Sequence, residues 1–179
     1  MVQTIVVDGD ITQVTADALL TPINAGGLWN GSVDQAIMRS SGSMFHDQAL
    51  AAMPLRDGQV IIANAAAPHK GLFDNVVFIV DELEQPISSL VLAALEAAEA
   101  QEFTSVSLPT FRTGLMVDVR ETRVEALRGL VNAIAQFIDE EPRHVQLITV
   151  VVYNNEVDQR YLDYSLLGLK MLNESMPYM

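Results

Sequence analysis

The chain has 179 residues, of which 50% are hydrophobic and 18% charged, so it is too apolar to be disordered and long enough to bury its own core. Its 10 Lys and Arg against 23 Asp and Glu give a formal net charge of −13. That balance argues against general binding of nucleic acids and of anionic membrane surfaces, because both depend on basic side chains. The absence of cysteine excludes disulfides and thiol-ligated metal sites.

No segment of the sequence indicates export or membrane insertion. The residues from Met1 to Thr4 carry no basic side chain, and Asp8 and Asp10 interrupt the apolar run that follows. No stretch approaches the roughly 18 consecutive apolar residues of a membrane-spanning helix. We therefore expect a soluble, cytoplasmic protein, whose oligomeric state the sequence does not indicate.

Short runs rich in β-branched residues predict the strands, and several of these runs lack strict alternation of polar and apolar residues. Continuous apolar runs of this kind are typical of strands that are covered on both faces of a sheet. The predicted strands span residues 4–7, 18–23, 59–63, 75–80, 105–108 and 146–152.

Helical periodicity fills the intervals between these strands. An apolar stripe runs from Val124 to Ile138, and Asp118 with Glu121 predicts the cap of that helix. A second stripe, from Val91 to Ala98, follows Ser88, which is a predicted N-cap. Further helices are predicted after the strand at 18–23 and over residues 43–53 and 156–172. The alternation predicts one domain over residues 1–179, a three-layer α/β/α fold with a central mixed, mostly parallel sheet.

The segment that follows the strand at 18–23 is a candidate phosphate-binding loop. It reads Asn24-Ala25-Gly26-Gly27-Leu28-Trp29-Asn30-Gly31-Ser32-Val33-Asp34. Successive backbone amides before a helix N-terminus suit phosphate, and open α/β sheets bind ligands beyond the carboxyl ends of their strands. The same residues allow a structural interpretation, because Ser32 and Gln35 form a capping box.

A second loop repeats the arrangement of strand, glycine loop and helix after the strand at 105–108. It reads Pro109-Thr110-Phe111-Arg112-Thr113-Gly114-Leu115. Two such loops at one edge of a sheet would close around a diphosphate from both sides. Neither loop matches the P-loop or the G-x-G-x-x-G pattern. The hypothesis of a diphosphate site therefore depends on both loops together, since each alone is a weak signal.

The sequence resembles the macro domain family in several blocks. They are Gly9-Asp10-Ile11-Thr12, then Ala16-Asp17-Ala18, then Asn24 with six residues before Gly31-Ser32-Val33-Asp34, continued by Gln35 to Gly42. The segment from Leu108 to Gly114 falls where that family has its second phosphate loop. The resemblance covers about residues 4–153 and implies binding of ADP-ribose. One branch of the family, with this spacing of Asn and Asp, hydrolyses ADP-ribosyl bonds on proteins or O-acetyl-ADP-ribose.

The resemblance also implies roles for single residues. Asp10 would accept a hydrogen bond from the adenine amino group beside the backbone of Ile11, and Tyr153 would stack on the ring. Asn24 would hold the distal ribose, and Asp34 would orient that ribose and a water, which makes these two the candidate catalytic residues. The rest of the implied ligand-binding set is Gly31, Ser32 and Val33 in the first loop and Arg112, Thr113, Gly114, Leu115 and Met116 in the second.

Departures from the family pattern keep other interpretations open. Trp29 stands where glycine is common, as a plug for the loop or as a lid on the ligand. Asp10 and Asn24 also suit turns, and Tyr153 also suits the core. Met116, which replaces an aromatic residue, puts the ribose pocket in question.

Three functions therefore remain open. The first is binding of ADP-ribose or a derivative, with possible hydrolysis of ADP-ribosyl or O-acetyl-ADP-ribose linkages. The second is a non-catalytic nucleotide sensor, and the third is an acidic protein-interaction domain with a lapsed pocket. Expected partners are the small ligand and an ADP-ribosylated protein. No cofactor or metal is expected, since the scattered His46, His69 and His144 form no ligand spacing.

Overall fold

The computed structural model describes residues 1–114 and 116–174, and these residues build one six-stranded sheet. Its strands are β1 (Gln3–Asp8), β2 (Ala16–Ile23), β3 (Val60–Asn64), β4 (Phe73–Val80), β5 (Ser105–Pro109) and β6 (Leu147–Val152). Their order is β1-β6-β5-β2-β4-β3, and all pairs are parallel except that of β3 with β4. The predicted strands are confirmed, and only their ends differ.

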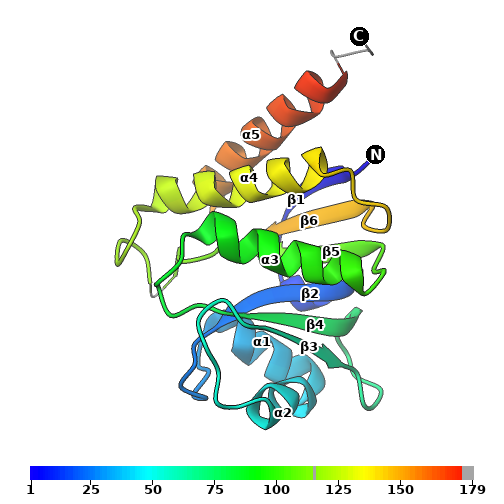
Figure 1. Ribbon diagram of the computed structural model, residues 1–179, viewed down its shortest axis with the longest axis vertical. Coiled ribbons are helices and arrows are strands. Elements are labelled where there is room, and N and C mark those ends of the chain that lie inside the picture. Colours follow the sequence, from blue (N-terminus) through cyan, green and yellow to red (C-terminus); the bar gives the residue numbers. More distant parts are fainter. Residues whose placement is uncertain (115, 175–179) are drawn as a thin grey trace.

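Helices cover both faces of this sheet, α3 and α4 on one face and α1 and α2 on the other (Figure 1). They are η1 (Ile11–Gln13), α1 (Ser32–Ser41), α2 (Met44–Ala51), α3 (Ile87–Ala100), α4 (Arg123–Asp139) and α5 (Glu156–Glu174). The last helix packs beside β1 and α4. The predicted α/β/α fold is confirmed. Within the described ranges, no helix combines the length and the apolar character that crossing a membrane requires.

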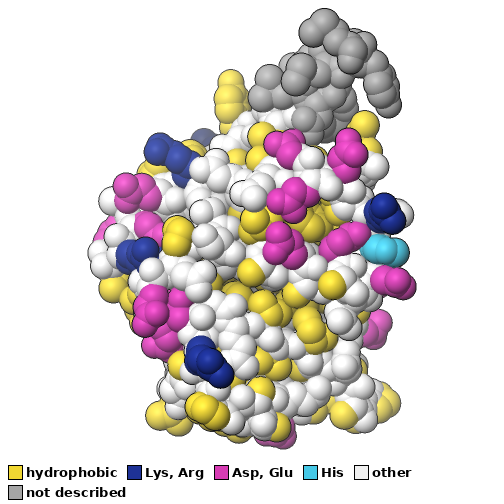
Figure 2. Space-filling view, viewed as in Figure 1, with side chains coloured by type: hydrophobic (Ala, Val, Ile, Leu, Met, Phe, Trp, Pro, Cys, Tyr) yellow, Lys and Arg dark blue, Asp and Glu magenta, His cyan; other side chains and the backbone are white. Residues whose placement is uncertain are grey.

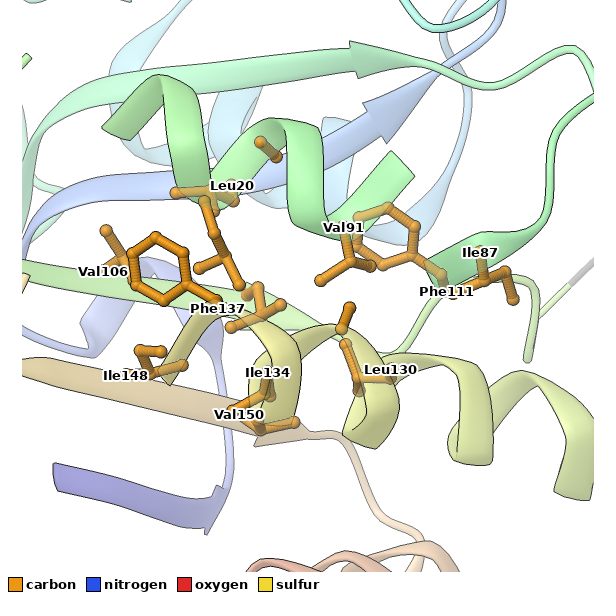
Figure 3. Packing of buried hydrophobic residues seen from close by; sticks show 14 of the residues in the cluster. Leu20, Ile87, Val91, Val106, Phe111, Leu130, Ile134, Phe137, Ile148 and Val150 are labelled. Atoms are coloured by element: carbon orange, nitrogen blue, oxygen red, sulfur yellow. The ribbon is translucent and has the colours of Figure 1, made fainter. Parts of the chain in front are cut away.

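The core explains why the strands read as continuous apolar runs. Leu20 and Val106 face α3 and α4, where they pack with Val91 and Ile134 (Figure 3). Leu19, the neighbour of Leu20 in β2, joins the second cluster on the opposite face. Successive side chains of a strand point to opposite faces, so a sheet covered on both sides buries nearly all of them.

Three predicted helix caps are wrong. Gly31 rather than Ser32 is the N-cap of α1, without a side-chain hydrogen bond. The N-cap of α3 is Pro86 rather than Ser88. Asp118 does not cap α4, because Glu121 binds Arg112 and a capping box forms further along between Thr122 and Glu125.

Two carboxylates bind backbone amides at or just before the starts of β5 and β6. Asp17 Oδ2 accepts hydrogen bonds from the backbone and hydroxyl of Thr104, at 2.7 and 2.8 Å, and from the backbone of Ser105. Burial raises the pKa of Asp17, but these hydrogen bonds outweigh it and hold the pKa below its ordinary value. Glu99 does the same for the backbone amides of residues 143–145, with a lowered pKa against the same opposing effect of burial.

Candidate functional site

A cavity of about 360 Å³ opens beyond the carboxyl ends of the central strands. Parallel pairing brings these ends together, since Asp8 lies beside Val152 and Pro109 beside Val151. The volume falls in the range of small-molecule sites, about 300–1,000 Å³. The residues that line the cavity are Gly9, Asp10, Ile11, Ser32, Val33, Gln35, Ala36, Arg39, Pro109, Val151 and Tyr153.

The N-terminus of α1 forms one wall of the cavity. Ser32 and Val33 line it, and the first intrahelical bond runs from Gln35 N–H to the carbonyl oxygen of Gly31. The three preceding amides, those of Ser32, Val33 and Asp34, have no hydrogen-bond partner among the described residues. Free amides at a helix N-terminus bind anions, so this wall suits a phosphate group.

Asp10 and Tyr153 lie at the part of the cavity formed by β1, η1 and the end of β6. Asp10 Oδ1 caps η1 by accepting hydrogen bonds from the backbone and hydroxyl of Thr12, at 2.9 and 2.7 Å. Its other oxygen has no partner in the described part of the chain, so the turn and the ligand interpretations are compatible. Tyr153 is 74% exposed on the rim, which excludes the core position that the sequence also allowed.

Arg39 is a lining residue that the sequence analysis missed. It lies on the same side of α1 as Ser32 and Gln35, at helical spacings of three and four residues. The periodicity that identified this helix would have indicated Arg39 once Ser32 was taken as a ligand residue. Gly9, Gln35, Ala36, Pro109 and Val151 were missed as well, because they contribute backbone or apolar surface rather than recognisable chemistry.

The two candidate catalytic residues do not line this cavity. Asn24 closes an Asx turn, in which its side-chain oxygen accepts from Gly26 N–H at 2.9 Å and its amide donates to the Leu28 carbonyl at 3.3 Å. Asp34 is only 7% exposed, and its Oδ1 lies 2.9 Å from His46 Nε2. In this structure both side chains therefore bind other partners, and their roles at a bound ribose stay predictions.

Trp29 acts as the plug rather than the lid. Its ring stacks on Phe78 at a centroid distance of 6.5 Å and lies 5.4 Å from the ring of His46. Its indole N–H donates to the Asn24 carbonyl oxygen at 2.9 Å. The indole thereby fastens the loop at 24–31 to α2 and β4 and leaves the cavity open.

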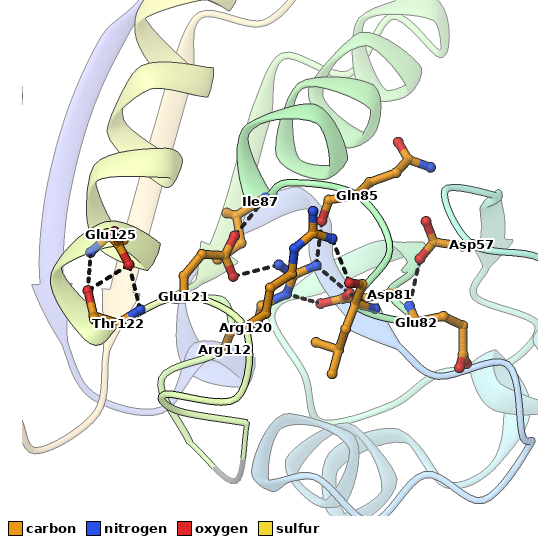
Figure 4. Close-up of polar contacts among 11 residues, drawn as sticks. Asp57, Asp81, Glu82, Gln85, Ile87, Arg112, Arg120, Glu121, Thr122 and Glu125 are labelled. Atoms are coloured by element: carbon orange, nitrogen blue, oxygen red, sulfur yellow. Dashed lines mark hydrogen bonds and ion pairs between the residues drawn. The ribbon is translucent and has the colours of Figure 1, made fainter.

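Arg112 of the second loop does not line the cavity, so the structure gives no support to its predicted ligand role. Its guanidinium, which is buried, binds Asp81 through two hydrogen bonds of 2.9 and 2.6 Å and Glu121 through one of 2.6 Å (Figure 4). It also donates to the Gln85 carbonyl oxygen at 2.8 Å. Burial opposes its charge, but these partners outweigh that effect and raise the pKa of Arg112.

The residues that follow Arg112 in the second loop also lie outside the cavity lining. Thr113 bonds to Thr110 through the two hydroxyls, at 2.6 Å, and its carbonyl oxygen accepts from Arg123. Thr113, Gly114 and Met116 do not line the cavity, while Leu115 lies outside the described residues. Among the residues of this loop that the structure describes, only Pro109 lines the cavity.

The charge of the site is mixed within a strongly acidic surface. Acidic side chains spread over the face that α3 and α4 cover, with basic ones at scattered points (Figure 2). The cavity, by contrast, holds one carboxylate and one guanidinium, those of Asp10 and Arg39. No group of three or more potential metal ligands occurs in the part of the chain that the structure describes.

The fold and the cavity together define an α/β protein with a small-molecule-sized cavity at the carboxyl ends of its parallel strands. No family model matches the sequence. The chain is 30% identical, over 87% of its own length and 91% of the other, to an O-acetyl-ADP-ribose deacetylase from Citrobacter rodentium. It belongs to the macro domain family.

Solved structures agree with this assignment. The Oceanobacillus iheyensis macrodomain with ADP aligns with a TM-score of 0.72 and 25% identity, over 96% of this chain and 92% of that one. The Trypanosoma brucei macrodomain in complex with ADP aligns with a TM-score of 0.77, over 91% of this chain and 68% of that one. At 17% identity the second likeness concerns the fold alone.

Proposed function

We propose that the chain binds ADP-ribose or a close derivative in the cavity between α1 and the ends of β5 and β6. The observation that carries the proposal is the N-terminus of α1, where Ser32 and Val33 have unpartnered backbone amides and line the same cavity as Asp10 and Tyr153. The relatives support it, since one is an O-acetyl-ADP-ribose deacetylase and a structural neighbour holds ADP.

The cavity supplies partners for the diphosphate and the adenine of ADP. The diphosphate lies against the amides of Ser32 and Val33, where backbone donors and the helix dipole favour negative charge. The adenine lies at the other end, where Asp10 accepts from its amino group and Tyr153 stacks on its face. Arg39 adds a cation to the same wall. Contact-distance donors outweigh the long-range repulsion of an acidic chain, which salt screens over about 8 Å.

Asp10→Asn tests this proposal without disturbing the fold. Asparagine keeps the oxygen that caps η1 but replaces the free carboxylate oxygen with a donor, which repels the adenine amino group. We expect the dissociation constant for ADP-ribose to rise about tenfold or more in titration calorimetry, because a hydrogen bond to a charged group is lost. Asp74→Asn is the matched control, since exposed Asp74 carries the same charge on β4 and does not line the cavity.

Replacing the ligand sharpens the test. The hypoxanthine analogue of ADP-ribose presents a carbonyl in place of the amino group, so it binds wild type worse than ADP-ribose and binds Asp10→Asn equally well or better. Absence of heat with ADP-ribose at millimolar concentration, or equal affinity of Asp10→Asn and wild type, contradicts the proposal.

Hydrolysis of O-acetyl-ADP-ribose is the second candidate, favoured by the similarity to the Citrobacter rodentium enzyme. In this proposal Asn24 holds the distal ribose and Asp34 orients a water, so both must leave the hydrogen bonds described above. ADP-ribosylated protein is a further candidate substrate. Release of acetate from O-acetyl-ADP-ribose, lost in Asp34→Asn while ADP-ribose binding persists, supports hydrolysis; unchanged release in that variant opposes the role of Asp34.

A further inference from the structure

The buried pair of Asp34 and His46 lies directly behind the wall that we assign to phosphate. Asp34 is the third residue of α1, and its Oδ1 meets His46 Nε2 of α2 at 2.9 Å. Its Oδ2 stays near the start of the helix, at 3.0 Å from the position that a Cβ on Gly31 would occupy. The carboxylate therefore lies within a short rotation of the unpartnered amides of its own helix.

A carboxylate at this position normally binds the backbone at the start of its helix, which here is the N–H of the N-cap Gly31. An acidic residue at the third helical position reaches back to the N-cap backbone, and it also gains from the helix dipole. In this protein such a contact would place a negative charge where the phosphate of the ligand has to bind. The carboxylate of Asp34 would thus compete with the phosphate of the ligand for the same site.

We propose that His46 is a positioning residue that keeps the carboxylate of Asp34 away from the phosphate. This inference rests on the proposed function. The Nε2–H of His46 donates to Asp34 and holds the carboxylate on the α2 side of α1. The amides of Ser32 and Val33 then stay open to the cavity.

The surroundings of His46 suit a fixed donor. The residue is 5% exposed, and its ring lies 5.1 Å from that of Phe78 and 5.4 Å from that of Trp29. Its Nδ1 is buried and has no hydrogen-bond partner among the described residues. A proton on Nδ1 would be an unsatisfied buried donor, so the neutral tautomer with the proton on Nε2 is favoured. Packing of the ring then fixes the direction of that donor.

A double-mutant cycle tests the inference with ADP and adenosine as probes. His46→Leu frees Asp34, so we expect about fivefold weaker binding of ADP and unchanged binding of adenosine, which lacks phosphate. Asp34→Asn in the same background removes the competing charge and restores ADP binding. His46→Gln, whose amide N–H also donates, keeps the affinity of wild type. Circular dichroism checks that each variant is folded.

A measurement without ligand separates this inference from the proposed function. Hydrogen exchange of the amides at the start of α1, from Gly31 to Val33, slows in His46→Leu, where Asp34 turns back to them, and returns to the wild-type rate when Asp34→Asn is added. If wild type binds neither ADP nor adenosine, the proposed function fails, and the exchange rates still decide the role of His46. Equal loss of ADP and adenosine binding, no restoration in the double variant, or unchanged exchange overturns the inference.

Discussion

Replacing Arg112 with methionine should destabilise the protein strongly. Arg112 is 6% exposed, and the side chains of its partners Asp81 and Glu121 are 8% and 19% exposed. The methionine side chain would fill a similar volume but leave two carboxylates facing each other without their cation. Removal of one partner from a buried ion pair typically costs about 3–5 kcal/mol.

The loss is large enough to measure by urea unfolding. With a slope near 2 kcal/mol per molar urea, a loss of about 3–5 kcal/mol lowers the midpoint by about 1.5–2.5 M. Arg160→Met is the matched control, because its pair with Glu156 spans 3.6 Å between side chains that are 82% and 86% exposed. That pair contributes about 0.5 kcal/mol or less.

Neutralising the two partners isolates the electrostatic part of the effect. In the Arg112→Met background, Asp81→Asn and Glu121→Gln remove the repulsion and should restore a large share of the lost stability. A midpoint that moves no further in Arg112→Met than in Arg160→Met refutes the reasoning. So does a triple variant that is less stable than Arg112→Met alone.

Other predictions concern the caps and the acidic side chains. Asp17→Asn lowers the free energy of unfolding at neutral pH, and the difference from wild type shrinks as acid protonates Asp17. The sign follows from the lowered pKa of Asp17 in the folded protein. The ionised carboxylate stabilises the fold above the ordinary aspartate pKa near 3.8, and this stabilisation is lost as the pH falls through the pKa that Asp17 has in the folded state. Urea midpoints measured between pH 7 and pH 3 check the prediction. Thr122→Ala removes the capping box of α4 and costs about 1 kcal/mol, whereas Ser88→Ala, outside any cap, leaves the thermal midpoint unchanged.

The sheet was predictable because its signal is local and redundant. Runs such as Val76 to Val80 are apolar at every position, which only a strand covered on both faces requires. The caps were less predictable, because a capping motif is short and several compete along one loop. Glu121 matches the pattern for Asp118, but Arg112 engages it from nine residues away.

The residues of the site also differ in how far the sequence could predict them. Asp10, Ile11, Ser32, Val33 and Tyr153 meet at the cavity, since the parallel sheet brings the ends of its strands together whatever the side chains are. The directions of Asp34 and Arg112 depend on His46 and on Asp81, which lie 12 and 31 residues away in the chain. No spacing rule within a loop contains those partners, so the sequence predicted where the first loop lies but not where the side chains of Asp34 and Arg112 point.

Binding and hydrolysis make opposite demands on Asp34. For binding, the carboxylate is best held by His46, because any approach to the amides of α1 opposes the phosphate. For hydrolysis, it has to lie near the distal ribose, which requires it to leave His46 and a buried position. The variant Asp34→Asn therefore separates the two: a binding protein keeps or gains affinity for ADP-ribose, and a hydrolase of O-acetyl-ADP-ribose loses turnover. His46→Leu adds a second comparison, because it releases the carboxylate of Asp34. In a binding protein this release weakens the binding of ADP, and in a hydrolase it leaves the carboxylate less ordered.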